Sequence, residues 1–223
     1  MIFLEVTLSF RNALLASAAS FALLSGAAQA ADLLISAAPE QAVASSNWDG
    51  FYAGMFAGHA SGTLTTTDNF VTSPYEEDYS GYLVGLQAGY NFTLSDNVVG
   101  GFAVDVAYND ATTEDPSYVA TVGWSGSATA RLGLDLGGIV PYALGGISVA
   151  SVEIADFPAA TDTQTHVGYT VGAGVEVALA DAISASVEYR YTNFGTQIYD
   201  LTNITTAELA DHSVRAGVNY HFN

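Results

Sequence analysis

Apolar and polar residues alternate along most of the chain from Trp48 onward. In residues 82–92 every second position is apolar, and the positions between are mostly Gly, Gln and Asn. The same period of two recurs in three later stretches, at residues 168–179, 183–194 and 213–222. This period is typical of β-strands with one apolar face, and no helical period of comparable strength follows Trp48. The pattern therefore predicts an all-β fold.

Eight stretches show this alternation. They lie at residues 48–60, 80–92, 98–109, 118–134, 139–152, 166–179, 183–195 and 211–222. The connections alternate between short ones, at 93–97, 135–138 and 180–182, and long ones, at 61–79, 110–117, 153–165 and 196–210. In a meander the short turns share one end and the long loops share the other. An even strand number with this asymmetry is the plan of a bacterial outer-membrane barrel. We predict an eight-stranded antiparallel up-and-down transmembrane β-barrel over residues 48–223.

The fifth stretch is the least regular of the eight. Pro141 and the Gly145-Gly146 pair interrupt its alternation. Both residue types mark irregularities in strands, so we expect a β-bulge there.

A soluble eight-stranded barrel of the lipocalin type would show the same alternation with its apolar face inside. The composition of the polar face therefore decides between a soluble barrel and a transmembrane barrel. This face consists mostly of Gly, Ser, Thr and Asn, with few charges and no lysine. A solvated outer face is normally dense in Lys and Glu, whereas small residues suit the narrow lumen of an eight-stranded barrel. This composition predicts that the apolar face meets lipid.

The few charges on the polar face balance each other. It carries three arginines and three acids, which are Arg131, Arg190, Arg215, Asp105, Glu176 and Glu188. Because lone buried charges cost several kcal/mol, we expect these six to form a paired cluster inside the barrel.

Aromatic residues gather near the strand ends. We expect an interfacial belt of Trp48, Phe51, Tyr90, Phe92, Tyr142, Tyr220 and Phe222 on the short-turn side, and of Tyr108, Tyr191 and Phe194 on the long-loop side. Ten tilted residues rise about 25 Å, which matches the lipid-facing band of such barrels.

Composition excludes several functions. Four Lys+Arg against 23 Asp+Glu give a formal charge of −19, so a nucleic-acid-binding footprint is absent. Zero cysteines exclude disulfides and thiolate metal sites. Most other acids fall in the predicted long loops, at Asp68, Glu76, Glu77, Asp78, Glu114, Asp115, Glu153, Asp156, Asp162, Asp200 and Glu208. Such loops are either solvated or hold divalent cations beside lipopolysaccharide, or contact a host partner.

Residues 1–30 have the features of a signal peptide. Arg11 precedes an apolar run that ends in the small-x-small sequence Ala28-Gln29-Ala30. We predict cleavage after Ala30 and export to the cell outer membrane. A membrane anchor is the alternative, but the run is short.

Several motifs occur in a characteristic order. They are Ala31-Asp32-Leu33, and the sequences at 48–54, 84–91, 141–147, 169–176, 187–195 and 212–222. Nearly all of residues 31–222 thus resembles the small outer-membrane β-barrel proteins of alphaproteobacteria. That group includes major surface antigens, haemin-binding members and porin-family proteins. The resemblance implies a periplasmic tail at 31–47 and a C-terminal signal, Tyr220 and Phe222, for the barrel-assembly machinery. Family chains usually end on the aromatic residue, whereas Asn223 follows it here.

Three functions remain open. The chain has no phosphate loop, zinc-finger spacing or nucleophile elbow, so we expect no enzyme activity and no cofactor. The favoured function is structural, as an envelope surface protein among outer-membrane lipid and lipopolysaccharide. A narrow pore is the second, although side chains fill an eight-stranded lumen. The third is a haem, metal or catalytic site at His59 and His212, because closure of the barrel brings the first and last strands together. His166 lies at the same end of the barrel, but its position in the alternation puts it on the opposite face.

Overall fold

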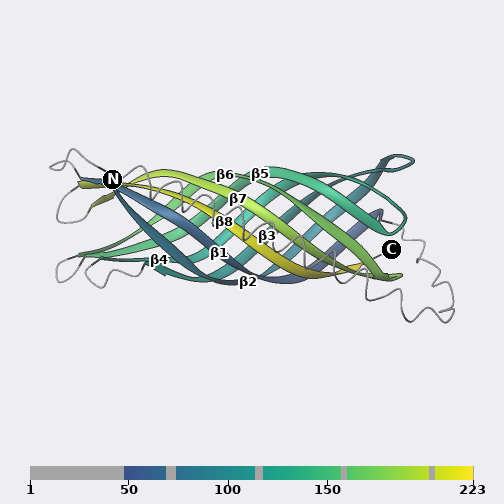
Figure 1. The fold of residues 1–223 in the computed structure, drawn as a ribbon, viewed down its shortest axis with the longest axis horizontal. Coiled ribbons are helices and arrows are strands. Elements are labelled where there is room, and N and C mark those ends of the chain that lie inside the picture. The colour runs from purple at the N-terminus through teal and green to yellow at the C-terminus, as the bar shows by residue number, and fades with distance from the viewer. Residues whose placement is uncertain (1–47, 69–73, 114–117, 157–159, 201–203, 223) are drawn as a thin grey trace, which may run out of the picture. The chain divides into compact units, whose positions relative to one another are not determined.

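The computed structural model describes residues 48–222, apart from 69–73, 114–117, 157–159 and 201–203. These residues form one closed barrel in which each strand pairs antiparallel with the next and the last pairs with the first (Figure 1). The strands are β1 (Gly50–Asp68), β2 (Tyr75–Ser95), β3 (Val98–Thr113), β4 (Tyr118–Leu134), β5 (Ile139–Asp156), β6 (Ala160–Ala180), β7 (Ile183–Asp200) and β8 (Ile204–His221). The predicted eight-stranded up-and-down barrel is confirmed. The predicted signal peptide, 1–30, and tail, 31–47, lie outside the described residues.

Helices contribute nothing to a membrane span here: within the described part of the chain, no helix is long and apolar enough to cross one.

Seven of the eight strands are longer than the alternation predicted, while β4 has the predicted bounds 118–134, and the strands contain 16 to 21 residues each. Much of what we expected as long loops is paired strand. Thr66 of β1, for example, pairs with Tyr75 of β2 on one side and Ala207 of β8 on the other. The expected loop positions of many acids were therefore wrong. Strands contain Asp68, Glu76, Glu77, Asp78, Glu153, Asp156, Asp162, Asp200 and Glu208, whereas Glu114 and Asp115 lie outside the described residues.

The faces exchange character along the barrel. In its middle, exposed side chains such as Met55, Leu86 and Ile147 are apolar, and the interior holds the charged residues beside a small apolar cluster that includes Phe56 and Leu83. Toward the long-connection end, residues 61–67, 76–80, 151–154 and 206–210 form what we call the collar. There the interior is mostly apolar, with Leu64 and Leu209 each 1% exposed, although Glu77 is buried there too, and the outside is polar. This reversal follows from the solvent, because lipid surrounds the middle and water surrounds the collar.

The aromatic belt is only partly as expected. Phe51, Tyr90, Tyr108, Tyr220 and Phe222 are exposed on the outer surface. Trp48, Tyr142 and Phe194 were wrongly assigned to the belt, because all three are buried inside the barrel. Position along a strand sets the depth of a side chain, but its parity sets which face it occupies.

Glycines make room for the large interior side chains. Tyr52 pairs in register with Gly89 of the neighbouring strand, and Tyr142 pairs with Gly174. A Cβ added at Gly89 would lie 2.5 Å from the Tyr52 ring, and one at Gly174 would lie 2.7 Å from the Tyr142 ring. Each ring thus fills the space above a glycine, which is how a narrow lumen accommodates aromatic residues.

The bulge expected in β5 was wrong, because the described register shifts lie in other strands, among them β4. β5 pairs with β6 without a shift from Ile139 to Asp156, whereas the β4–β5 register shifts between Val122 and Ser125. The Asn109 amide donates to the carbonyl of Gly123, at 3.0 Å, inside this irregularity. A side chain thus satisfies a backbone carbonyl at the point where the ladder is interrupted.

Candidate functional site

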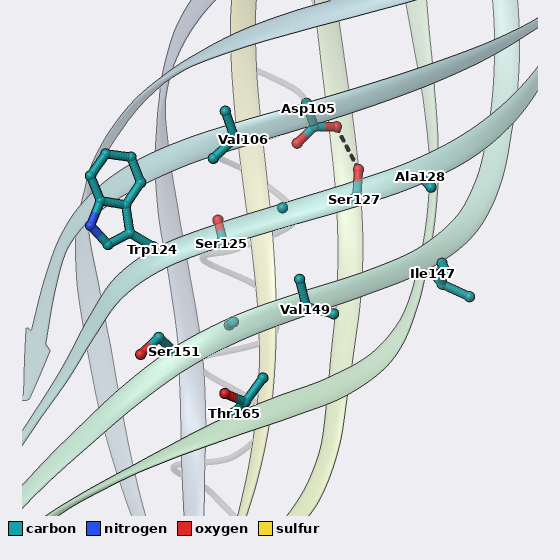
Figure 2. A pocket seen from close by; sticks show the side chains of 12 residues that line it. Asp105, Val106, Trp124, Ser125, Ser127, Ala128, Ile147, Val149, Ser151 and Thr165 are labelled. Carbon is teal, nitrogen blue, oxygen red and sulfur yellow. Dashed lines mark hydrogen bonds between the residues drawn. The ribbon is translucent and has the colours of Figure 1, made fainter.

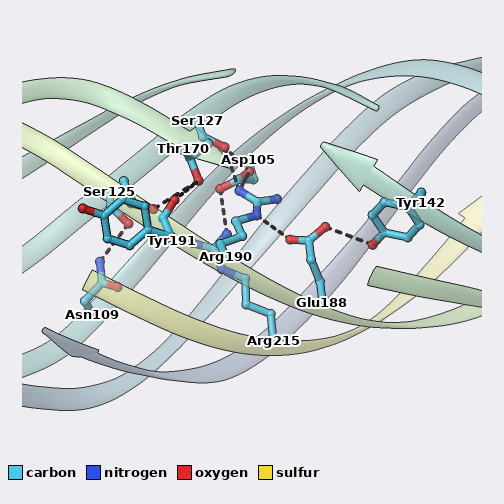
Figure 3. Close-up of polar contacts among 11 residues, drawn as sticks. Asp105, Asn109, Ser125, Ser127, Tyr142, Thr170, Glu188, Arg190, Tyr191 and Arg215 are labelled. Atoms are coloured by element: carbon cyan, nitrogen blue, oxygen red, sulfur yellow. Dashed lines mark hydrogen bonds and ion pairs between the residues drawn. The ribbon is translucent and has the colours of Figure 1, made fainter. Parts of the chain in front are cut away.

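The middle of the lumen holds all six charged residues of the predicted cluster. Figure 3 shows four of them, Asp105, Glu188, Arg190 and Arg215. Arg190 donates to Asp105 at 2.8 Å and also pairs with Glu188, its neighbour two positions along β7. Arg215 lies 3.3 Å from the second oxygen of Asp105. Ser127 of β4 donates to Asp105 as well, so this carboxylate joins its own strand, β3, to β4, β7 and β8.

A second group surrounds Glu176 of β6. Its carboxylate pairs with Arg131 at 2.7 Å and accepts hydrogen bonds from Ser184, at 2.5 Å, and Asn219, at 2.8 Å. His221 Nε2 lies 3.6 Å from the same carboxylate and 3.0 Å from the Ser184 hydroxyl. Glu176 is fully buried, so these partners replace the water that it would otherwise need.

Tyr142 connects the two groups. Its hydroxyl donates to Glu188 at 2.9 Å, and the Arg131 guanidinium lies over its ring at 5.1 Å from the centroid. Arg131 also lies over Tyr52, at 5.2 Å. We call the six charged residues together with Tyr142, Ser127 and Ser184 the central network.

The central network has the energetics of a buried ion cluster. The side chains of Arg190 and Asp105 are 4% and 3% exposed, and three positive charges meet three negative ones. Desolvation opposes such clusters, and each charge is tolerated only while its partners remain. The network therefore contributes a fixed geometry more than net stability.

The lumen is filled at three levels. Within the central network the remaining cavity measures about 20 Å³, which is enough for roughly one water molecule. Trp48, Val99 and Val140 form an apolar cluster on the short-turn side. A larger apolar cluster, including Leu64, Ile154 and Leu209, fills the collar. Side chains thus fill the lumen of the described barrel at each of these three levels.

The three candidate histidines do not share one site. His59 and His212 lie on the outer surface of the adjacent strands β1 and β8, where His59 pairs with Val214 and His212 with Ser61. They are diagonal neighbours, but their rings contact different partners. His59 contacts Tyr82, whereas His212 contacts Tyr191 and accepts or donates a 2.6 Å hydrogen bond with Tyr189. His166 is fully buried in the interior. Among the described residues, no group of three or more His, Asp or Glu is arranged to hold a metal ion.

Sequence reasoning missed His221 and Tyr142 as members of the interior site. Parity placed His221 on the polar face, but its contact with Glu176 depends on the pairing of β6, β7 and β8, which alternation does not reveal. Ser184, His221 and Glu176 combine the residue types of a hydrolytic triad. At 1%, 5% and 0% exposure they lie where no substrate reaches them in this structure.

The two residues of the predicted assembly signal lie at the end of β8. Tyr220 and Phe222 both point outward, with ring centroids 5.1 Å apart. The Phe222 amide donates to the Phe51 carbonyl at 2.9 Å, so the C-terminus is tied to β1 where the barrel closes.

A closed barrel with an apolar exterior, a charged interior and an even number of meandering strands is a transmembrane β-barrel of the Gram-negative outer membrane. The chain belongs to the outer membrane protein beta-barrel domain family, whose model matches residues 16–222. It is therefore an outer-membrane protein, as predicted.

Similar proteins come from alphaproteobacteria. The chain is 32% identical over 186 residues to the 25 kDa outer-membrane immunogenic protein of Brucella abortus. The matched region covers 83% of this chain and 84% of the Brucella protein. The chain is 31% identical over 177 residues to the 22 kDa outer membrane protein of Rhizobium leguminosarum, covering 79% of each. Among solved structures, Neisserial surface protein A matches with a TM-score of 0.52 at 20% identity, over 78% of this chain and 97% of that one. This last likeness concerns the fold.

Proposed function

We propose that this outer-membrane protein is a structural surface protein, neither an open pore nor an enzyme. The observation that carries the proposal is the filled lumen. The central network leaves a cavity of about 20 Å³, and apolar clusters lie on both sides of it. A solute would have to displace paired buried charges, which costs several kcal/mol per ion.

Planar-bilayer recording of the mature chain tests this part of the proposal. We expect no large, steady openings in the refolded protein. The control is a variant carrying Arg131→Ala, Arg190→Ala and Arg215→Ala, which removes every positive charge from the lumen. Large, stable conductance from the unmodified chain would overturn the proposal.

The collar supports a surface role. It presents exposed acids, among them Glu76, Asp78, Glu153 and Glu208, while the chain's three arginines beyond residue 30 all lie inside the barrel. An acidic wall beside the phosphates of lipopolysaccharide requires divalent counter-ions, whose preferred ligands are oxygens. We infer that divalent cations mediate contact between the collar and lipopolysaccharide. Binding to lipid A vesicles should fall when EDTA removes magnesium, and equal binding in both conditions would exclude this contact.

The chain ends fit the same proposal. A signal peptide at 1–30 would direct export, and residues 31–47 would form a periplasmic tail. Tyr220 and Phe222 would present the C-terminal signal to the barrel-assembly machinery. Sequencing the N-terminus of the protein from outer-membrane fractions tests the cleavage, which we expect after Ala30.

A further inference from the structure

The lipid-facing surface of β4 is hollowed between its neighbours. Two adjoining hollows of about 510 Å³ and 640 Å³ share Ala128 and Ile147 in their walls. The outward residues of β4 in this region are Gly126, Ala128 and Ala130, which are small. The side chains of Val104 and Val106 rise on the β3 side, and those of Ile147 and Val149 rise on the β5 side. The first hollow follows β4, and the second continues from Ala128 and Ala130 across β3 to Tyr90 of β2 and Phe51 of β1. We call the two hollows together the β4 groove.

The outer end of the β4 groove is polar. Trp124 lies there with Ser151 and Thr165, while Val149, Ile147 and Ala128 line it further along (Figure 2). The β4 bulge places Trp124 on the outer surface, and its ring packs edge-on against Tyr108 of β3, with centroids 5.4 Å apart. The indole therefore leans toward β3. Its N–H and the two hydroxyls form an uncharged, hydrogen-bonding end at the collar side.

The part of the β4 groove that runs along β4 has the length of one leaflet. From Trp124 to Ala130 the strand runs for six residues, or about 20 Å, and a tilt near 40° reduces this to a rise of about 15 Å. That is half of a hydrocarbon core about 30 Å thick. Because the polar end faces the collar, the leaflet concerned is the outer one.

We propose that the β4 groove binds one acyl chain of lipid A, the acylated anchor of lipopolysaccharide, as an ordered lipid. The groove is continuous with the surface that contacts membrane lipid, and its occupant therefore comes from the outer leaflet. Chain linkages in lipid A are esters, amides and hydroxyls, which match the Trp124 N–H and the hydroxyls of Ser151 and Thr165. The proposal rests on the proposed surface role, because that role places the collar on the outer side of the membrane. Binding of the acyl chain needs no divalent cation, whereas the proposed contact of the collar with lipopolysaccharide does.

Filling the groove should expel the acyl chain. Ala128→Leu extends a side chain along the floor. Gly145→Leu fills the second hollow, where the nearest atoms to an added Cβ lie 3.8 Å away. Ala216→Leu makes the same change as the first variant at an exposed lipid-facing position of β8 outside the groove, so it is the matched control. Heat-modifiable gel mobility shows that each variant is folded.

Native mass spectrometry of the detergent-solubilised mature protein, titrated with lipid A in EDTA, measures the bound lipid. We expect one lipid A per barrel, and about tenfold weaker binding in the two filled variants, the factor for losing contact with roughly two methylenes. Ala216→Leu should bind as the unmodified protein does. Equal binding in all four proteins would overturn the proposal, as would equally tight retention of phosphatidylcholine. A dimer signal lost on filling the groove would instead identify a second copy as the occupant.

The collar serves as a separate control. Glu76→Gln with Asp78→Asn should weaken magnesium-dependent binding to lipid A vesicles and leave binding in EDTA unchanged. Failure of the collar contact and failure of the groove are thus distinguishable.

Discussion

The hydroxyl of Tyr142 donates a hydrogen bond to Glu188 at 2.9 Å, across the lumen from β5 to β7. β6 lies between these strands in the barrel order, so this bond spans a non-adjacent pair. Glu188 pairs with Arg190 in the group around Asp105, and the Tyr142 ring lies under Arg131 in the group around Glu176. The bond between Tyr142 and Glu188 therefore links the two groups. The interior is thereby tied between strands that do not pair with each other, and not only between paired neighbours.

Tyr142→Phe should destabilise the barrel. The substitution keeps the ring beneath Arg131 but removes a donor from a buried carboxylate, which costs about 1.5–3 kcal/mol. Urea unfolding in detergent micelles measures the change in the free energy of unfolding. Tyr189→Phe is the control, because Tyr189 bonds His212 on the exposed outer surface, and its effect should stay within about 0.5 kcal/mol. Equal losses in the two variants would contradict a special role for the interior bond.

Arg190→Met should be more damaging. Arg190 serves both Asp105 and Glu188, so its removal leaves two buried carboxylates short of a cation, with an expected cost of about 3–5 kcal/mol. Adding Asp105→Asn and Glu188→Gln should restore part of the loss, since the stranded charges are then gone. The same unfolding measurement in a mutant cycle checks this. Additive losses would show that the three residues act independently.

The sequence specified the wall of the barrel better than its ends. Alternation located the strands, and the parity of Arg131, Arg190 and Arg215 put them on one face. It missed the collar, because the Thr- and acid-rich segments there were taken as loops although Leu64 and Leu209 still alternate with polar residues. Where a strand passes from lipid into water, its apolar residues move from the outer face to the inner face. The alternation keeps its period of two.

Contacts across the lumen were beyond the sequence for a different reason. His221 meets Glu176, and Tyr142 meets Glu188, only once barrel closure and strand stagger are fixed. One residue of slip would turn every side chain to the other face. Trp48, Tyr142 and Phe194 show the same limit of sequence reasoning. Their positions near the strand ends were predicted, but not that their side chains lie inside the barrel.

Two glycines on opposite faces of the barrel wall, Gly174 toward the lumen and Gly145 toward lipid, should respond differently to a methyl group. At Gly174 an added Cβ would meet the Tyr142 ring at 2.7 Å and the Val187 carbonyl at 2.8 Å, so Gly174→Ala should cost about 1–3 kcal/mol through overpacking. At Gly145 the nearest atoms lie 3.8 Å away, so Gly145→Ala should leave the free energy of unfolding unchanged or raise it by about 0.5 kcal/mol. Urea unfolding compares the pair directly. A larger loss at Gly145 would mean that β5 faces the other way.

The two tryptophans report opposite faces of the wall. Trp48 is 3% exposed and packs edge-on against His221 inside the barrel, whereas Trp124 is 59% exposed toward lipid. In vesicles of phosphatidylcholine with brominated acyl chains, the Trp48→Phe variant, which keeps Trp124, should lose most of its fluorescence to contact quenching. The Trp124→Phe variant, which keeps Trp48, should retain most of its fluorescence, because the barrel wall separates the indole from the bromines.

Ordinary phosphatidylcholine vesicles give the unquenched reference for each variant, and acrylamide added in water separates lipid contact from water contact. Trp48 should be protected from both quenchers, since Val99 and Val140 pack around it at the short-turn end. Strong bromine quenching of Trp48, with Trp124 protected, would place the apolar face inside the barrel. That result would invert the orientation on which the lipid contacts of this protein depend.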